Sequence, residues 1–168
     1  MGAAFELERW SDFFVAQAGA TAALVGLVIV AISINLKEIV QARLLAGRAL
    51  ETVAMLGGIL LLSTLALVPG QGIEVLGIEL IVLSVMLASI HGAILFRARK
   101  IRHESEVRWL RILLAAGSVV PPALGGLSLI AGPGGWLAGG VYWLVVAVVF
   151  GLIGGLTNSW ILLVEILR

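Results

Sequence analysis

Five apolar segments, each long enough to cross a lipid bilayer, constrain this chain more than any other feature. A helix rises about 1.5 Å per residue, so about 20 apolar residues span the hydrocarbon core of a membrane. The segments cover residues 13–36, 49–68, 75–96, 109–130 and 137–163 of the 168 in the chain. The sequence therefore predicts an all-α polytopic integral membrane protein, with five transmembrane helices in one domain that takes in residues 1–168.

The composition excludes the common classes of soluble protein. Hydrophobic residues make up 61% of the chain and charged residues only 12%, against about 45–50% and about 25% in soluble domains. A soluble fold of this length has too little interior to bury so much apolar surface. We therefore exclude a soluble enzyme, a disordered chain and a nucleic-acid-binding protein. The chain has no cysteine, so it has no disulfide or thiolate metal site.

The basic residues predict an orientation in the membrane. Ten of the eleven lysines and arginines lie in the segments after the first, third and fifth spans or at their edges, and only Arg9 precedes the first span. Cytoplasmic loops are enriched in lysine and arginine, so we expect the N-terminus outside and the C-terminus inside. Trp10 and Trp136 then fall at the outer boundary, and Trp109 and Trp160 near the inner one.

Two cytoplasmic segments have a predicted role of their own. Residues 36–47 fit a short amphipathic helix on the membrane surface, with Asn35 as the N-cap, Glu38 completing a capping box and Gly47 ending the helix. The loop of residues 97–108 is the most basic stretch of the chain. We expect this loop to contact anionic lipid headgroups.

Small residues recur at four-residue spacing in three spans. In lipid, small side chains let helix backbones approach closely and so favour helix association. Such stripes can pack the helices of one protomer or form a subunit interface, and three of them favour a homo-oligomer. The stripes comprise Ala18, Ala22 and Gly26 in the first span, Ser84, Ala88 and Gly92 in the third, and Ala147, Gly151 and Gly155 in the fifth.

Two adjacent prolines, Pro121 and Pro122, lie in the middle of the fourth span. Proline removes a backbone donor and clashes with the preceding turn, so the pair predicts a kink. The kink can serve packing alone, with the freed carbonyls bonded by neighbouring side chains. Alternatively, it is a hinge, or it exposes backbone carbonyls to a polar cavity.

Acidic and amide side chains occur within the outer and inner thirds of the spans. Ionisable groups at membrane depth are costly, so each needs a partner or water. For Glu51 we expect a pair with Arg48 or a favourable interaction with the start of its own helix. Glu79 needs cover from another helix or a water-filled space, and Gln17 and Thr21 are its candidate partners.

His91 lies in the inner third of the third span, at a depth that matches Asn158 in the fifth and Glu51 in the second. Together with Ser33 these residues predict a polar cluster in the inner half of the membrane. One interpretation is a structural hydrogen bond from His91 to nearby backbone or to Asn158. The other is a titrating or ion-contacting histidine that lines a pathway.

Catalytic and metal-binding patterns are lacking in the sequence. The two histidines, His91 and His103, form no HxxxH or HExxH pattern, and Asp12 is the sole aspartate. There is also no glycine-rich phosphate-binding loop followed by lysine. We expect no catalytic residue, no enzymatic activity, no metal site and no cofactor.

The N-terminal part of the chain resembles a family of small bacterial multi-span membrane proteins that have no assigned activity. The resemblance rests on apolar motifs within residues 10–71, namely Trp10–Phe14, Gly19–Gly26, Val30–Leu36, Arg48–Glu51 and Leu67–Gln71. It implies a bacterial source, and hence the cytoplasmic (inner) membrane, and a fixed hairpin of the first two spans. It assigns no site residue.

Two functions fit these patterns. The first is a homo-oligomeric channel or transporter-like protein that conducts a small ion or solute. The second is a non-catalytic structural or regulatory subunit that binds another membrane protein. The surroundings of Glu79 and His91 discriminate between them, because a wet cavity favours transport, whereas bonds within the protomer favour the subunit.

The predicted topology can be tested by labelling. Single cysteines in place of Gln71 and Gly134 should react with an impermeant thiol reagent in intact cells, because their loops carry no basic residue. A cysteine in place of Ser105, in the basic loop, should react only after the cells are opened. Labelling of the Ser105 position in intact cells would contradict the predicted orientation.

Overall fold

The prediction of an all-α protein with five spans is confirmed by the computed structural model, which describes residues 5–98, 108–133 and 135–166. Five helices of the described part are long and apolar enough to cross a membrane. The elements are η2 (Leu7–Trp10), α1 (Ser11–Ile34), α2 (Leu36–Gln41), α3 (Arg43–Ala66), α4 (Ile73–Ala98), α5 (Arg108–Ala131) and α6 (Tyr142–Ile166).

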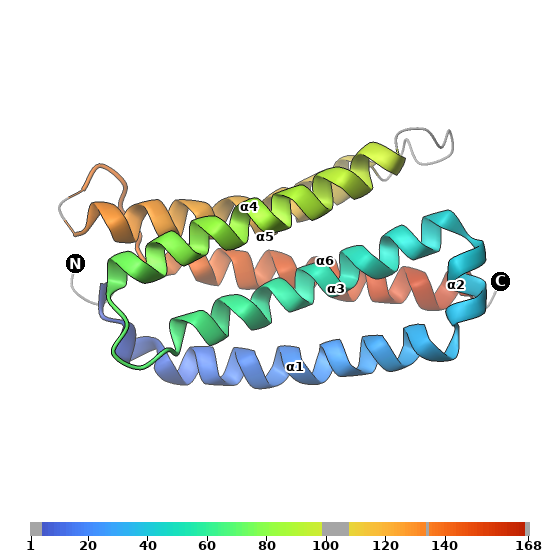
Figure 1. Ribbon diagram of the computed structural model, residues 1–168, viewed down its shortest axis with the longest axis horizontal. Helices are drawn as coiled ribbons and strands as arrows, with labels where there is room; N and C mark the ends of the chain where they lie inside the picture. The colour runs from blue at the N-terminus through green and yellow to red at the C-terminus, as the bar shows by residue number, and fades with distance from the viewer. Residues whose placement is uncertain (1–4, 99–107, 134, 167–168) are drawn as a thin grey trace.

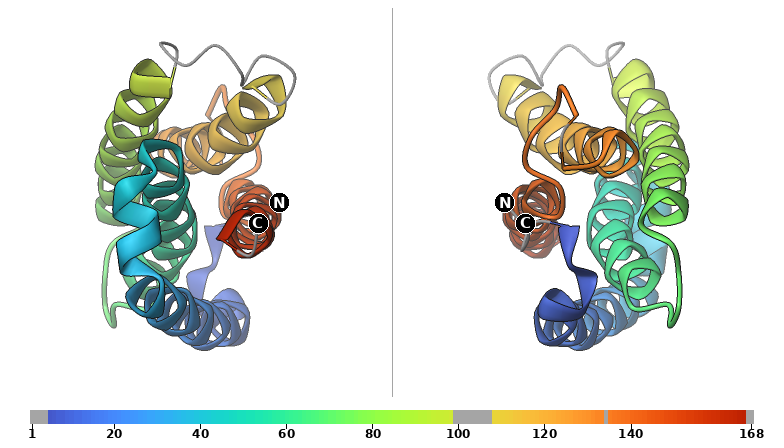
Figure 2. Two further views of the ribbon diagram at one scale, coloured as in Figure 1. Left: turned by 90° about the vertical axis from the view of Figure 1, so that its right-hand side faces the viewer. Right: turned by 90° about the vertical axis from the view of Figure 1, so that its left-hand side faces the viewer.

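The long helices run side by side, and the two chain termini lie at opposite ends of the bundle (Figure 1). Viewed end-on, α3, α4, α5 and α6 surround the bundle axis, while α1 lies outside this ring and packs against α3 (Figure 2). One end carries α2, the end of α4 and the start of α5; we call it the basic end, because Lys37, Arg48, Arg97 and Arg111 lie near it. Most of the basic loop of residues 97–108 lies outside the described residues.

The segment after α1 differs from the single amphipathic helix expected over residues 36–47. The α2 helix ends at Gln41, and Ala42 is extended, with φ −100° and ψ 101°. The next helix begins at Arg43, six residues before the predicted start of the second span, and runs through Gly47. Asn35 does not cap α2, because its Nδ2 donates to the carbonyl of Ala31 at 2.9 Å and so binds the end of α1 instead.

The fifth span begins later than predicted, at Tyr142 instead of residue 137. Gly139 and Gly140 adopt positive φ values of 118° and 48°, which only glycine takes up readily, so the helix cannot start before them. Ser128 of α5 anchors this turn: its Oγ donates to the carbonyl of Leu137 at 2.8 Å and accepts from the amide of Gly140 at 2.9 Å.

Glycines set the closest approaches between helices. A Cβ built on Gly77 of α4 would lie 2.7 Å from the carbonyl oxygen of Gly126 on α5, and a Cβ on Gly126 would meet the carbonyl of Gly77. The two backbones are therefore in direct contact. Because lipid supplies no hydrophobic drive between helices, this contact stabilises the α4–α5 pair, the most extensively packed pair of the bundle.

Substituting Gly126 by alanine should destabilise the fold by about 1–3 kcal/mol, because backbone atoms must move to admit one methyl group. Gly92→Ala on α4 is the matched control, since a Cβ there has no neighbouring heavy atom within 4 Å. Unfolding in mixed detergent micelles measures both free energies. Equal stability of the two variants would show that the backbone contact contributes nothing.

Candidate functional site

The buried charged, imidazole and amide side chains of the four-helix ring lie toward the basic end. Glu51 on α3 is fully buried, and Arg111 on α5 is only 6% exposed. The Arg111 guanidinium donates to Glu51 Oε2 from Nη2 at 2.7 Å and from Nε at 3.2 Å. Both donors meet one carboxylate oxygen, so a charge-assisted ion pair joins two helices that otherwise touch little.

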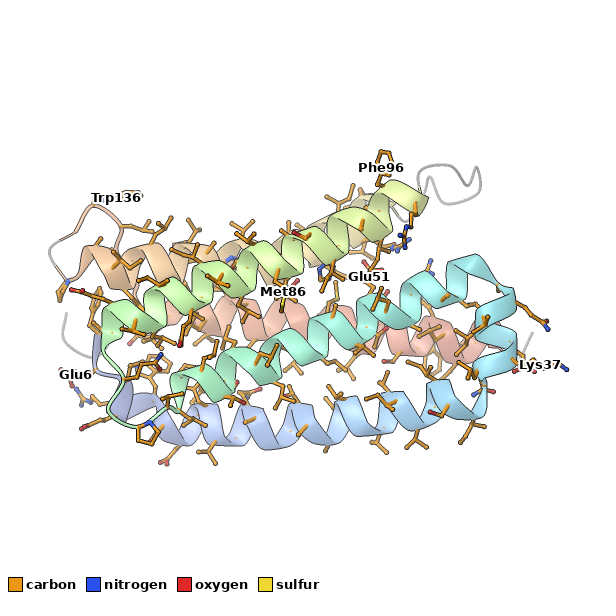
Figure 3. All side chains as sticks on the ribbon, viewed as in Figure 1. Glu6, Lys37, Glu51, Met86, Phe96 and Trp136 are labelled. Atoms are coloured by element: carbon orange, nitrogen blue, oxygen red, sulfur yellow. The ribbon has the colours of Figure 1, made fainter. Side chains whose placement is uncertain are left out.

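This partner differs from the one expected for Glu51. The sequence analysis placed Glu51 at the start of its helix, near Arg48. Because α3 begins at Arg43, Glu51 lies about two turns inside the helix and gains little from the helix dipole. Figure 3 shows Glu51 within the bundle, on the part of α3 toward the basic end.

Sequence reasoning missed Arg111 and Arg48 as interior residues, because it counted both with the cytoplasmic charges. Each lies within its helix, and both are buried. A signal existed for Arg111: it follows Trp109, which the sequence analysis places near the inner membrane boundary, so the same prediction puts Arg111 on the lipid side of that boundary.

His91 and Asn158 are buried in α4 and α6, about two turns from the basic end of each helix. His91 Nδ1 lies 2.8 Å from the carbonyl oxygen of Leu87 in its own helix. A carbonyl only accepts, so Nδ1 carries the proton and donates. The ring nitrogen Nε2 and the second Glu51 oxygen, Oε1, are buried without a hydrogen-bond partner among the described residues. Ser33, by contrast, is exposed and lies outside the cluster.

Glu79 also finds its partner within the chain, but on a different element from the one expected. The Nε2 of Gln71 donates to Glu79 Oε2 across the turn that joins α3 to α4. Thr21 is fully buried and donates to the carbonyl of Gln17 at 2.6 Å, one turn back in α1. Thr21 therefore bonds within α1, and Glu79, almost two turns into α4, is bonded to Gln71 and not to Gln17 or Thr21.

The three small-residue stripes have different surroundings. In α6, Ala147, Gly151 and Gly155 are buried, and a Cβ on Gly151 or Gly155 would meet Ile59 or Leu56 of α3. In α4, Ser84 is buried and donates to Leu80, while Ala88 and Gly92 are exposed. In α1, Ala18 is half-buried, whereas Ala22 and Gly26 are exposed.

The proline pair lies inside α5, and the helix continues through it from Arg108 to Ala131. Pro121 and Pro122 are both buried. Ser118, one turn earlier, is buried as well, and its Oγ donates to the carbonyl of Ala115 at 2.9 Å. Both prolines therefore lie on the buried side of α5.

The described residues contain no group of three or more histidine, aspartate or glutamate side chains that could hold a metal ion. Comparison with protein-family models, with curated proteins and with solved structures finds no match for the chain.

Breaking the buried ion pair should be costly. Arg111→Met leaves the Glu51 carboxylate in the interior without its two donors and should lower the free energy of unfolding by about 3–5 kcal/mol. The double variant Glu51→Met/Arg111→Met removes both charges and should recover a large part of that loss. Glu74→Gln, at an exposed carboxylate of α4, is the control and should change the stability little. A double variant no more stable than Arg111→Met would show that the pair is not the cause.

Proposed function

We propose that this protein is a non-catalytic membrane subunit that binds a transmembrane helix of another membrane protein along α1. The main support is a face of small residues on this helix that the rest of the described chain leaves uncovered. It is formed by Gly19, Ala22, Ala23 and Gly26, and we call it the α1 stripe. All four residues are exposed. The same interface accommodates a second copy of the chain if the subunit is a homo-oligomer.

The geometry of the α1 stripe suits a helical partner. Its spacing of three and four residues places all four members on one face of the helix. A Cβ added at Gly19 or Gly26 would have no heavy atom within 4 Å. Only Phe14 and Thr21 of α1 are buried within the chain, so most of the helix surface is open to a neighbour.

The chain already uses this kind of contact internally. On α6, Gly151, Gly154 and Gly155 let α3 approach so closely that a Cβ at any of them would lie within 3 Å of an α3 side chain. Close backbone approach is the main source of helix association in lipid, where burial of apolar surface gains little. The α1 stripe offers the same chemistry on the outside of the protein.

The polar groups favour a subunit over a channel. Glu79 pairs with Gln71, and Glu51 with Arg111, both within the chain. At the end opposite the basic end most of the interior is apolar: its fully buried side chains include Leu76, Leu80, Leu129, Val141 and Leu144, beside the two hydroxyls of Ser63 and Ser128. Among the described residues, no charged or amide side chain of the ring is buried at this end.

The outer surface gives no support for a wet axis between protomers. Ser33, Thr64 and Ser89 are exposed hydroxyls, and each donates at 2.8 Å to a carbonyl one turn back in its own helix. Such bonds satisfy the hydroxyl without water. The large side chains exposed around these hydroxyls are apolar, which suits contact with lipid or with another apolar helix.

We infer that the membrane is the bacterial inner membrane, with the basic end in the cytoplasm. The positive charges at this end support the orientation, and the resemblance of residues 10–71 to bacterial proteins supports the location. The N-terminal segment, with Trp10 stacked edge-on against Tyr142 at 4.9 Å between ring centroids, then lies at the outer boundary.

Enlarging the α1 stripe should release the partner. Gly19→Leu and Gly26→Leu each place a bulky side chain where two backbones should meet, so the complex extracted from native membranes in mild detergent should dissociate to a folded 17.6 kDa protomer. Ala20→Leu, exposed on α1 but to the side of the stripe, is the matched control and should keep the complex intact. Native mass spectrometry measures the masses.

The mass of the wild-type complex identifies the kind of partner. A whole-number multiple of the protomer mass indicates a second copy, and any other mass indicates a different protein. A wild-type protein that is monomeric in mild detergent would contradict the proposal. So would a complex that survives both stripe substitutions.

A further inference from the structure

Glu51 and His91 each have one buried polar atom that forms no hydrogen bond within the described part of the chain. Two donors of Arg111 are bonded to Oε2 of Glu51, and Oε1 of the same carboxylate is left over. His91 donates from Nδ1 to the carbonyl of Leu87, and its Nε2 is left over in the same way. Buried polar atoms of proteins almost always have a partner, so both atoms point to a ligand between the helices.

His91 lies on the face of α4 that meets α3. A Cβ built on Gly47 of α3 would lie 3.7 Å from Cγ2 of Ile94, one turn after His91. A Cβ built on Gly58 of α3 would lie 2.9 Å from Cδ1 of Leu87, one turn before His91. Residues three and four apart share a face of a helix, so His91 lies between two contacts of α4 with α3.

Glu51 lies on the matching face of α3. It follows Gly47 by one turn and precedes Gly58 by two turns, so it falls between the same two contacts. The order of these contacts runs in opposite directions along α3 and α4, and interpolation between them puts Glu51 level with His91. The two side chains, which are 0% and 3% exposed, therefore lie opposite each other inside the ring.

Asn158 of α6 reaches this level from another side of the ring. A Cβ built on Gly154, one turn before Asn158, would lie 3.5 Å from Cβ of Leu114 on α5. Leu114 in turn lies one turn after Arg111, so Asn158 is level with Arg111. Its side chain is buried, and its amide has both a donor and an acceptor. Each helix of the ring thus contributes one polar side chain to a single level.

The two open atoms call for a small neutral molecule with two donors. Oε1 of Glu51 and Nε2 of His91 are both acceptors, so neither satisfies the other and neither binds an anion. A metal ion would find only these two ligand atoms and would lie beside the cation of Arg111. A proton on Nε2 would add a further cation to the buried guanidinium groups of Arg48 and Arg111, which is costly in a low-dielectric interior.

We propose that the ring binds one water molecule at this level. The water donates one hydrogen to Oε1 of Glu51 and the other to Nε2 of His91, and the amide of Asn158 supplies a third bond. A buried water typically makes about three hydrogen bonds to polar groups that are otherwise unsatisfied. It joins α4 and α6 to the ion pair of α3 and α5, so one polar network links all four helices. The site lies inside the ring and does not depend on the partner proposed for α1.

The proposal is tested by nuclear magnetic resonance of the full chain in deuterated detergent, with histidine labelled by 13C and 15N. His103→Gln serves as the background, because His91 is then the single histidine. We expect a neutral ring protonated on Nδ1. We also expect cross-relaxation from water to the proton on Cδ2, which lies beside Nε2 and away from the exchangeable proton on Nδ1, with the sign given by a water that stays bound.

Removing the carboxylate removes one of the two acceptors that hold the water. Glu51→Met/Arg111→Met should therefore abolish the cross-relaxation. Glu51→Leu/Arg111→Leu removes the same groups and decides the matter if the first double variant does not fold. Ser84→Ala, which removes a buried hydroxyl of α4 that bonds to Leu80, is the matched control and should keep the signal.

Four results would each overturn the proposal. The first is the lack of this cross-relaxation in the background protein, and the second is a ring protonated on both nitrogens. The third is a signal that persists in a folded double variant, and the fourth is a signal that the control variant also loses.

Discussion

Lipid offers a helix no hydrogen-bond partner and little hydrophobic drive toward its neighbours, and the arrangement of this protein follows from that constraint. Polar groups therefore need hydrogen-bond partners within the chain, and helices associate through close contact between their backbones. Thr21, Ser33, Thr64 and Ser89 meet the first requirement by donating to their own helix backbones. The backbone contact between Gly77 and Gly126 meets the second.

The interior of the ring divides along its length. Toward the basic end an ion pair between Glu51 and Arg111 joins α3 to α5, with the buried side chains of His91 and Asn158 on the other two helices of the ring. At the opposite end the interior contains mainly leucine and valine, with the hydroxyls of Ser63 and Ser128. A buried pair is expensive to separate, so it fixes which helices face each other, whereas the apolar half relies on shape.

The small-residue faces of two helices differ in whether another helix covers them. The α6 glycines are covered by α3, but the corresponding small residues of α1 are open. An uncovered small-residue face and an apolar groove against α6 lie on the same helix, and for this reason we propose α1 as the element that binds a partner. A helix so weakly covered by its own chain suits a subunit whose assembly with a partner completes its packing.

The five spans were predictable because apolar length is a local property of the sequence. The helix ends were less so: the start of α6 depends on Gly139 and Gly140 taking positive φ, and Asn35 bonds backward to Ala31 instead of forward. The candidate site was predicted only in its members Glu51, His91 and Asn158. Its central bond joins residues 60 positions apart, and no local pattern specifies that Glu51 turns to Arg111 in place of Arg48.

Ion flux through reconstituted protein tests most directly whether the polar interior holds helices together or lines a path. Proteoliposomes should show no proton or monovalent-cation flux above protein-free liposomes at any pH between 5 and 8, the range in which an ordinary histidine titrates, because the apolar half of the ring closes the interior. A pH-dependent flux that disappears in a folded His91→Ala variant would contradict this, and would make the cluster part of a conduction pathway.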